Sequence, residues 1–250
     1  MSSLRVKGGV KLSGDIRPQG AKNEALQVIC ATLLSESDIT ISNIPDIIDV
    51  NKLIEILKNL GVKIQELDKG KFCFNAKDIN LEYLNNGDFL EDAKSLRGSI
   101  MLVGPLLSRF GSASIPRPGG DKIGRRRLDT HFINLEKLGA KLEYNSNKRT
   151  YSVISKDSLK GTSILLDEAS VTGTANIIMA AVLADGPTSI YNAACEPYIQ
   201  QLCLLLNNMG ANISGIGSNL LNIVGVKKLN GANHQILPDM IEIGSWIGLA

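Results

Sequence analysis

The sequence predicts an α/β fold made of three repeated units, with buried helices innermost and with sheets and amphipathic helices outside. Two observations support this prediction. One pattern of helix, glycine and strands occurs three times, and three further segments are apolar on nearly every side. The chain has 250 residues, of which 44% are hydrophobic, so it can bury a substantial core.

The repeated pattern centres on three glycines. The pieces LGVKIQ, LGAKLE and MGANIS place Gly61, Gly139 and Gly210 at equivalent positions. Each glycine follows apolar residues at helical spacing, over residues 47–60, 128–138 and 199–209. A glycine just past the last turn supplies the left-handed conformation that ends many helices. We therefore predict three amphipathic helices, each followed by two alternating strands.

A second kind of helix precedes each amphipathic one. Residues 24–34, 98–107 and 174–183 are apolar on nearly every side and rich in Ala, Gly and Ser. Such helices are buried all round, whereas alternating strands can face water on one side. The three are therefore predicted to lie in the centre. An ordinary α/β sandwich without internal symmetry is the alternative.

The last residues predict a fourth turn and buried helix, within the run ILPDMIEIGSWIGLA. A helix ending on Trp246–Ala250 would expose apolar side chains, so the chain is expected to be incomplete and to continue into further repeats. Asp239 and Glu242 lie at i and i+3 of this turn, a spacing that favours helix capping over catalysis.

Composition excludes several classes of protein. The formal charge of +2 argues against a nucleic-acid binder that relies on phosphate neutralisation. The four cysteines lack C-x-x-C spacing and are expected to be reduced. There is no signal-peptide pattern, and no apolar run reaches about 18 residues, so we expect a cytoplasmic protein that does not contact membranes. His131 and His234 lack partners at metal spacing, and no metal is expected.

Cations stand where helices begin. Lys22 starts the first buried helix, Lys94 and Arg97 open the second, and the third begins with SVTGTAN. Helix starts carry partial positive charge, so cations are unfavourable there unless an anion binds. Together these starts predict a site for phosphate or carboxylate; the alternative is that the cations extend into solvent.

Residues 117–131, RPGGDKIGRRRLDTH, form the most distinctive segment. Its single proline, Pro118, and its three glycines predict a mobile loop. Five cations flank Asp121; they are Arg117, Lys122, Arg125, Arg126 and Arg127. A nucleic-acid contact is disfavoured because aromatic residues are not interleaved. Arginine suits phosphate and carboxylate, so we expect a lid that closes over a phosphate-bearing small molecule.

Seven motifs in this order resemble the enolpyruvyl transferase family. They are GAKN (20–23), LRGS (96–99), PGGDKIG (118–124), RRRLD (125–129), ASVTGT (169–174), NAACEP (192–197) and LPDMIEIG (237–244). The resemblance covers residues 3–250. It implies an inside-out α/β barrel over residues 22–236, with repeats near 22–95, 96–168 and 169–236. Residues 1–21 and 237–250 would then be pieces of a second domain that is mostly absent.

The resemblance also implies a reaction. Members of the family that share these motifs transfer the enolpyruvyl group of phosphoenolpyruvate to the 3′-hydroxyl of UDP-N-acetylglucosamine and release phosphate, which is the first committed step of peptidoglycan synthesis. Neither a metal nor an organic cofactor is implied. The implied catalytic residues are Asp121, Lys22 and Arg126. The implied substrate-binding residues are Lys22, Asn23, Arg97, Arg126, Arg127, Leu128, Asp129, Thr130, Ser170 and Val171. The base and further arginines would lie in the absent domain, which is the expected partner.

Two positions depart from the family pattern. Asp121 stands where most members carry a cysteine that is alkylated by the epoxide fosfomycin. A carboxyl can donate a proton but attacks an epoxide poorly, so insensitivity to fosfomycin is expected. Neighbouring cations should favour ionised Asp121, which opposes its role as an acid unless burial offsets them. Glu168 replaces a lysine that commonly contacts the nucleotide.

Three alternatives remain. A related transferase acts on shikimate 3-phosphate, but the PGGDKIG lid followed by RRRLD favours the sugar nucleotide. The 250 residues taken alone could be a non-catalytic piece that only binds a UDP-sugar. A cyclase acting on RNA ends uses related repeats, but the weak net charge disfavours it.

Overall fold

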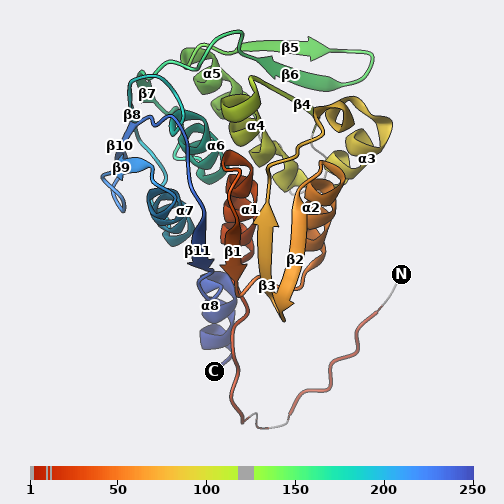
Figure 1. The fold of residues 1–250 in the computed structure, drawn as a ribbon. Helices are drawn as coiled ribbons and strands as arrows, with labels where there is room; N and C mark the ends of the chain where they lie inside the picture. Colours follow the sequence, from red (N-terminus) through yellow and green to blue (C-terminus); the bar gives the residue numbers. More distant parts are fainter. Residues whose placement is uncertain (1–2, 10, 12, 118–126) are drawn as a thin grey trace.

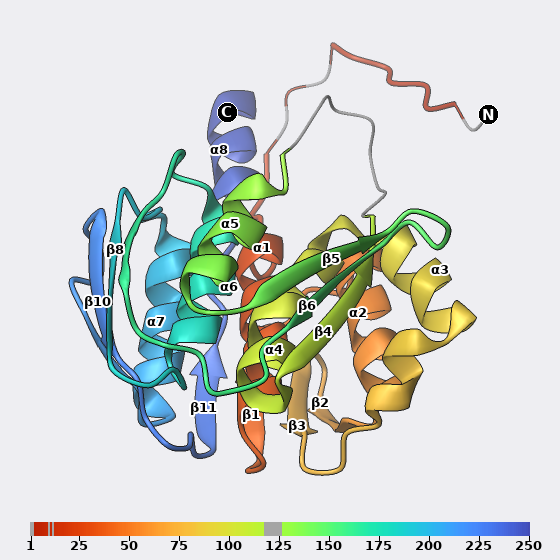
Figure 2. The ribbon, with the colours of Figure 1, turned by 90° about the horizontal axis from the view of Figure 1, so that it is seen from above.

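The three apolar segments form the innermost helices of the molecule. In the computed structural model, which describes residues 3–9, 11, 13–117 and 127–250, these helices lie in the middle, with the sheets around them (Figure 2). They are α1 (Lys22–Ala31), α4 (Val103–Phe110) and α6 (Val171–Ala181). All residues from Gly173 to Ala181 are buried, as expected for a helix without a polar face. The predicted inner helices are confirmed.

Short 3-10 helices extend two of the three. η1 (Thr32–Leu34) continues α1, and η3 (Arg97–Leu102) leads into α4. The second inner helix therefore starts one residue earlier than the sequence predicted, and with a tighter turn.

The amphipathic helices are α2 (Ile48–Asn59), α5 (Asp129–Lys137) and α7 (Pro197–Asn208). Each buries one face; α2 buries Val50, Leu53, Ile54, Ile56 and Leu57. Gly61, Gly139 and Gly210 have φ of 102°, 100° and 101°, which is the left-handed conformation that glycine adopts without strain. The three predicted helix ends are confirmed.

Three sheets surround the helices (Figure 1). The first has the order β11-β1-β3-β2, the second β4-β6-β5 and the third β7-β8-β10-β9. The first contains β11 (Ala232–Gln235), β1 (Ile39–Ser42), β3 (Lys71–Asn75) and β2 (Lys63–Asp68). The second contains β4 (Ser112–Pro116), β6 (Thr150–Ile154) and β5 (Lys141–Asn145). The third contains β7 (Ser163–Leu165), β8 (Pro187–Tyr191), β10 (Leu220–Val224) and β9 (Asn212–Ser214). The two alternating strands predicted after each amphipathic helix are confirmed as β2–β3, β5–β6 and β9–β10.

Two strands connect one repeat to the next. β7 comes from the second predicted repeat and pairs in parallel with β8 of the third. β11 comes from the third and pairs in parallel with β1 of the first, with Ile41 opposite His234. The last repeat is thereby joined to the first, which gives the three units a closed arrangement around one core.

The segment between β3 and η3 holds two elements that the repeat pattern did not predict. They are η2 (Leu81–Asn85) and α3 (Gly87–Ser95). Lys94 lies in the last turn of α3, exposed and 3.5 Å from the Glu91 carboxylate. It therefore does not open the second buried helix, contrary to prediction, because an extended residue, Leu96, separates α3 from η3.

The fourth predicted helix is α8 (Met240–Leu249). Asp239 caps it by accepting hydrogen bonds from the backbone N–H groups of Ile241 and Glu242, which confirms the capping role. No residue of α8 is buried, and Ile247 is 72% exposed, so the expected exposure of apolar side chains on this helix is confirmed. The helix and the N-terminal segment both extend away from the body at one end (Figure 1).

All four cysteines are free thiols. Burial raises the pKa of Cys203 to about 12 and raises that of Cys30 further, so both thiols stay protonated and serve as packing groups. Among the described residues, no helix combines the length and apolarity that crossing a bilayer requires.

Candidate functional site

The starts of α1, η3 and α7 meet at one end of the inner helices. Gly98 of η3 packs on α1, because a Cβ at this position would lie 3.1 Å from Leu26 Cδ1. The Tyr198 hydroxyl of α7 hydrogen-bonds the side chain of Asn23 of α1. Residues far apart in the chain are thus neighbours around the first turn of α1.

The starts of α5 and α6 complete this arrangement. Arg97 of η3 is close enough to His131 of α5 to affect its charge, and His131 Nε2 lies 3.3 Å from Thr172 Oγ1 of α6. The loop before α7 returns to α6, where Ala194 N–H donates to Thr174 Oγ1 at 3.0 Å. These contacts form a closed circuit, and we call the first residues of α1, η3, α5, α6 and α7 the helix-start ring.

Carboxylates contact both the side-chain ammonium group and the backbone N–H of Lys22. Its Nζ is 3.3 Å from Asp49 Oδ2 of α2, with the two side chains 46% and 43% exposed. Its backbone N–H donates to Asp239 Oδ2 at 3.4 Å. No side chain caps α1 at Ala21, so a cation here is unfavourable unless negative charge lies nearby. Asp49 supplies part of that charge, and a bound anion could do the same.

Asn23 lies beside Tyr198, which has negatively charged side chains nearby. Burial and the Glu196 carboxylate raise the pKa of Tyr198, with a smaller contribution from Asp239, while the hydrogen bond from Asn23 lowers it. The phenol is therefore neutral and can both accept and donate hydrogen bonds.

His131 connects three elements of the ring. Burial, and to a lesser degree Arg97, lowers its pKa to about 4, so the imidazole is neutral near pH 7. Its Nδ1 accepts from Asn176 Nδ2 at 2.9 Å, which leaves the proton on Nε2, facing Thr172. Asn176 also donates to Ile100 O and accepts from Gly104 N–H, both at 2.8 Å. The network therefore fixes α5, α6 and the η3–α4 unit to one another.

The start of α5 carries a compact charge cluster. Arg127 Nε is 2.9 Å from Asp129 Oδ2, and Arg127 Nη1 is 3.6 Å from Asp167 Oδ2. The buried Thr130 hydroxyl donates to Asp167 Oδ1 at 2.9 Å. This bond is the main cause of the lowered pKa of Asp167. The guanidinium of Arg127 is thus oriented by two carboxylates, with more than half of its surface exposed.

Backbone groups at the starts of α5 and α6 follow ordinary capping geometry. Leu128 O accepts from the N–H groups of His131 and Phe132. Ser170 is the N-cap of α6, and its Oγ accepts from Gly173 N–H at 3.2 Å. Val171 is the first residue of α6. The remaining N–H groups at these starts can serve as hydrogen-bond donors for an anion.

The structure therefore brings most of the sequence-predicted residues onto one ring. They are Lys22, Asn23, Arg97, Arg127, Leu128, Asp129, Thr130, Ser170 and Val171. Asp121 and Arg126 lie outside the described residues. The sequence did not predict Asp49, Tyr198 and Asp167 as site residues. Each is distant in the sequence from the predicted residue that it contacts, and only the fold brings the two together. The motif NAACEP preceding Tyr198 was a signal that could have pointed to α7.

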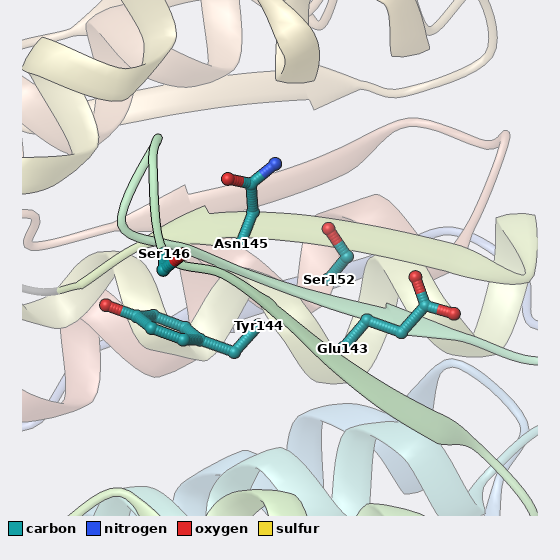
Figure 3. A pocket seen from close by; sticks show the side chains of 5 residues that line it. All are labelled: Glu143, Tyr144, Asn145, Ser146 and Ser152. Carbon is teal, nitrogen blue, oxygen red and sulfur yellow. The ribbon is translucent and has the colours of Figure 1, made fainter.

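Outside the helix-start ring, the hollows in the described part of the chain are shallow. A shallow hollow on the β5–β6 hairpin is lined by Glu143, Tyr144, Asn145, Ser146 and Ser152, and Figure 3 shows these side chains spread along the hairpin, without a common centre. No group of three His, Cys, Asp or Glu residues is placed to hold a metal in the described ranges.

Comparisons with known proteins identify the family. The chain matches the family described as EPSP synthase (3-phosphoshikimate 1-carboxyvinyltransferase) over residues 6–250. It is 60% identical over 250 residues to the UDP-N-acetylglucosamine 1-carboxyvinyltransferase of Bacteroides fragilis, covering 100% of this chain and 57% of that protein. It is 50% identical over 251 residues to the protein of that name from Treponema denticola, with the same coverage. The chain thus spans 57% of the length of these relatives.

Solved structures share the fold. The enolpyruvyl transferase NikO from Streptomyces tendae superposes with a TM-score of 0.81 at 21% identity, covering 96% of this chain and 55% of that chain. EPSP synthase from Acinetobacter baumannii gives a TM-score of 0.68 at 20% identity, covering 91% and 50%. The predicted inside-out α/β architecture is confirmed as an enolpyruvyl transferase fold. The chain belongs to the EPSP synthase family.

Proposed function

We propose that this chain is part of an enzyme that transfers the enolpyruvyl group of phosphoenolpyruvate to the 3′-hydroxyl of UDP-N-acetylglucosamine and releases phosphate. The observation that carries the proposal is the helix-start ring, which gathers Lys22, Asn23 and Arg97 where helix starts favour anions. The name shared by the Bacteroides fragilis and Treponema denticola relatives supports the choice of substrates. The reaction would belong to cytoplasmic peptidoglycan synthesis.

Phosphoenolpyruvate brings a phosphate and a carboxylate, and both need cations. Lys22 Nζ is 3.3 Å from Asp49, an exposed pairing of modest strength. We propose that a substrate anion competes with Asp49 for this ammonium group. Arg97, at the start of η3, would hold the second anionic group through its planar guanidinium.

The sugar nucleotide would lie across the starts of α1, α5 and α6. Asn23 offers amide hydrogen bonds to the sugar. Arg127, Leu128, Asp129 and Thr130, together with Ser170 and Val171, offer backbone N–H groups and side chains to the uridine and diphosphate. The carboxylates that orient Arg127 keep it protonated but offset its positive charge, and Glu168 adds a further negative charge nearby. Contact with the diphosphate is therefore expected to depend on backbone donors more than on side-chain charge.

In the addition step, the 3′-hydroxyl oxygen bonds to C2 of phosphoenolpyruvate and loses its proton, while C3 gains a proton. In the elimination step, the C2–O bond to phosphate breaks and C3 gives up a proton, which restores the double bond. We propose Asp121 as the acid that protonates C3 and Arg126 as a cation that stabilises the developing phosphate charge.

We propose that the base and further cations come from a second part of the same polypeptide, corresponding to the portion of the relatives that this chain does not span. Residues 22–236 would form one domain and the segments 1–21 and 237–250 would belong to the other. The chain alone would then bind a UDP-sugar without transferring the enolpyruvyl group.

A phosphate-release assay tests this proposal. A full-length version of the protein should release phosphate only when phosphoenolpyruvate and UDP-N-acetylglucosamine are both present. Lys22→Ala should lower kcat/KM by about 100-fold or more, as loss of a charge-stabilising group does, whereas Lys52→Ala on exposed α2 surface should not.

Two outcomes contradict the proposal. Phosphate release with shikimate 3-phosphate in place of the sugar nucleotide would favour the related transferase. Sugar-nucleotide binding without phosphate release from phosphoenolpyruvate, whichever acceptor is present, would favour a non-catalytic binding protein.

A further inference from the structure

Glu24 is a carboxylate buried in the first turn of α1. The residue has no exposed surface, and it follows Lys22 and Asn23 directly. One oxygen is 2.8 Å from His234 Nε2, and the other accepts the Leu237 N–H at 3.2 Å. Both oxygens are therefore engaged by groups that lie more than 200 residues away in the sequence.

The partners of Glu24 belong to a segment that runs beside the entry to α1. Gly20 and Pro238 form an antiparallel bridge. Ala21 N–H donates to Leu237 O, and Asp239 N–H donates to Gln19 O, both at 2.8 Å. We call residues 19–21 and 236–239 the paired segments. Glu24 connects the paired segments to the body of the molecule, because it contacts both Leu237 and His234 of β11.

Packing alone does not explain a carboxylate at this position. The neighbouring buried positions of α1 hold Ala25, Leu26 and Val28, and an apolar side chain would avoid the cost of burying charge. What a carboxylate adds is two directed hydrogen bonds. They fix the first turn of α1 relative to the paired segments, which also present Asp239 to the Lys22 N–H.

We infer that Glu24 is a positioning residue: its carboxylate, held by His234 and by the Leu237 N–H, sets the placement of Lys22 and Asn23 for substrate binding. This inference rests on the proposed function. Loss of the two hydrogen bonds should free the paired segments and shift Lys22, which misplaces the anion site without changing its composition.

Three substitutions at Glu24 separate this role from general stability. Glu24→Met removes both acceptors while keeping a similar length. Glu24→Asp keeps the charge but is one methylene shorter, so it cannot reach both donors, and it gives the same readouts if the Met variant does not fold. Glu24→Gln is the conservative rescue, because its amide oxygen can accept from Leu237 and its amide nitrogen can donate to the imidazole. Glu55→Met, on the exposed face of α2, is the control.

Two measurements are needed. Hydrogen exchange of this chain should rise in the Met and Asp variants within residues 19–24 and 234–239, and stay unchanged in the rest of the molecule. In full-length protein, the KM for phosphoenolpyruvate should rise about tenfold in the same variants, because small misplacements weaken binding and rate. Glu24→Gln and Glu55→Met should match wild type in both measurements.

Uniformly faster exchange with an unchanged KM and a reduced kcat would indicate a merely structural role and overturn the inference. Unchanged local exchange in both the Met and Asp variants would overturn it as well. A wild-type protein that transfers nothing would refute the proposed function itself, and the positioning role with it, whatever the exchange data show.

Discussion

At the scale of single residues, His131 shows how a buried polar group can hold several helices together. Its ring nitrogens lie 2.9 Å from Asn176 and 3.3 Å from Thr172, so both are used. A protonated imidazole would place a second N–H against the amide of Asn176, which donates there. Burial and the positive charge of Arg97 also disfavour protonation, because both lower the pKa of the imidazole.

This network predicts a specific pH dependence of stability. The pKa of His131 falls from its ordinary 6.5 to about 4 in the folded state, so between these values the unfolded chain binds a proton that the native chain does not. Stability therefore falls as pH drops through this range. Between pH 7.5 and 5.0 the wild-type chain should lose about 2 kcal/mol more than His131→Gln, measured by urea unfolding. Equal losses in the two proteins would show that His131 is not held neutral.

Single residues also show where sequence reasoning stops. Lys22, Arg97 and Thr130 could be placed at the site because each lies in a contiguous motif at a helix start. The pairing of Glu24 with His234 joins residues 210 positions apart, and neither sequence neighbourhood suggests the other. Such contacts depend on how the repeats close, which local patterns do not specify.

At the scale of elements, the inner and outer helices and the two strands after each outer helix were predicted, whereas the strands between inner and outer helices were not. The inner helices have an unbroken apolar surface and the outer ones a clear period, both of which are local signals. β1, β4 and β8 lie between each inner and outer helix but have only four or five residues. The predicted strands β5 and β6 are equally short, but they follow the repeated pieces around the three glycines, and no such repeat marks β1, β4 and β8. α3 was missed because it lies outside the repeat pattern.

Close approach of inner helices gives a prediction for Gly104. A Cβ here would meet the Asn176 backbone and come within 2.7 Å of its Oδ1, and backbone cannot move aside easily. Gly104→Ala should therefore destabilise the chain by about 1–3 kcal/mol through overpacking, despite the better helix propensity of alanine.

Gly87 at the start of α3 is the matched control, since a Cβ there would meet nothing within 4 Å. Gly87→Ala should be neutral or stabilise by about 0.4–1 kcal/mol. Chemical denaturation of both variants measures the contrast. Equal stability of the two would mean that α4 and α6 do not pack as closely as described.

At the scale of the whole molecule, the repeats predicted three units but not how they join. β11 pairs with β1, and β7 pairs with β8, so each of these sheets combines strands from two repeats. Strand order depends on pairing between distant segments, which a period in the sequence does not encode. The closed arrangement brings the five helix starts to one end.

The exposure of α8 belongs to this scale too. Its sequence is apolar, as an inner helix requires, and Asp239 caps it as predicted. Burial needs a partner surface, however, and in the described part of the chain no residue of α8 is buried. The pattern of the helix could be predicted from the sequence, whereas its surroundings could not.

The central claim is that starts of separate elements form one ligand site, and NMR titration of the labelled chain with UDP-N-acetylglucosamine tests it most directly. Backbone amides of Asn23, Thr130 and Ser170, from α1, α5 and the start of α6, should shift together along a single saturation curve. Shifts confined to one of these elements, or centred on residues 143–146 of the β5–β6 hairpin, would contradict the account.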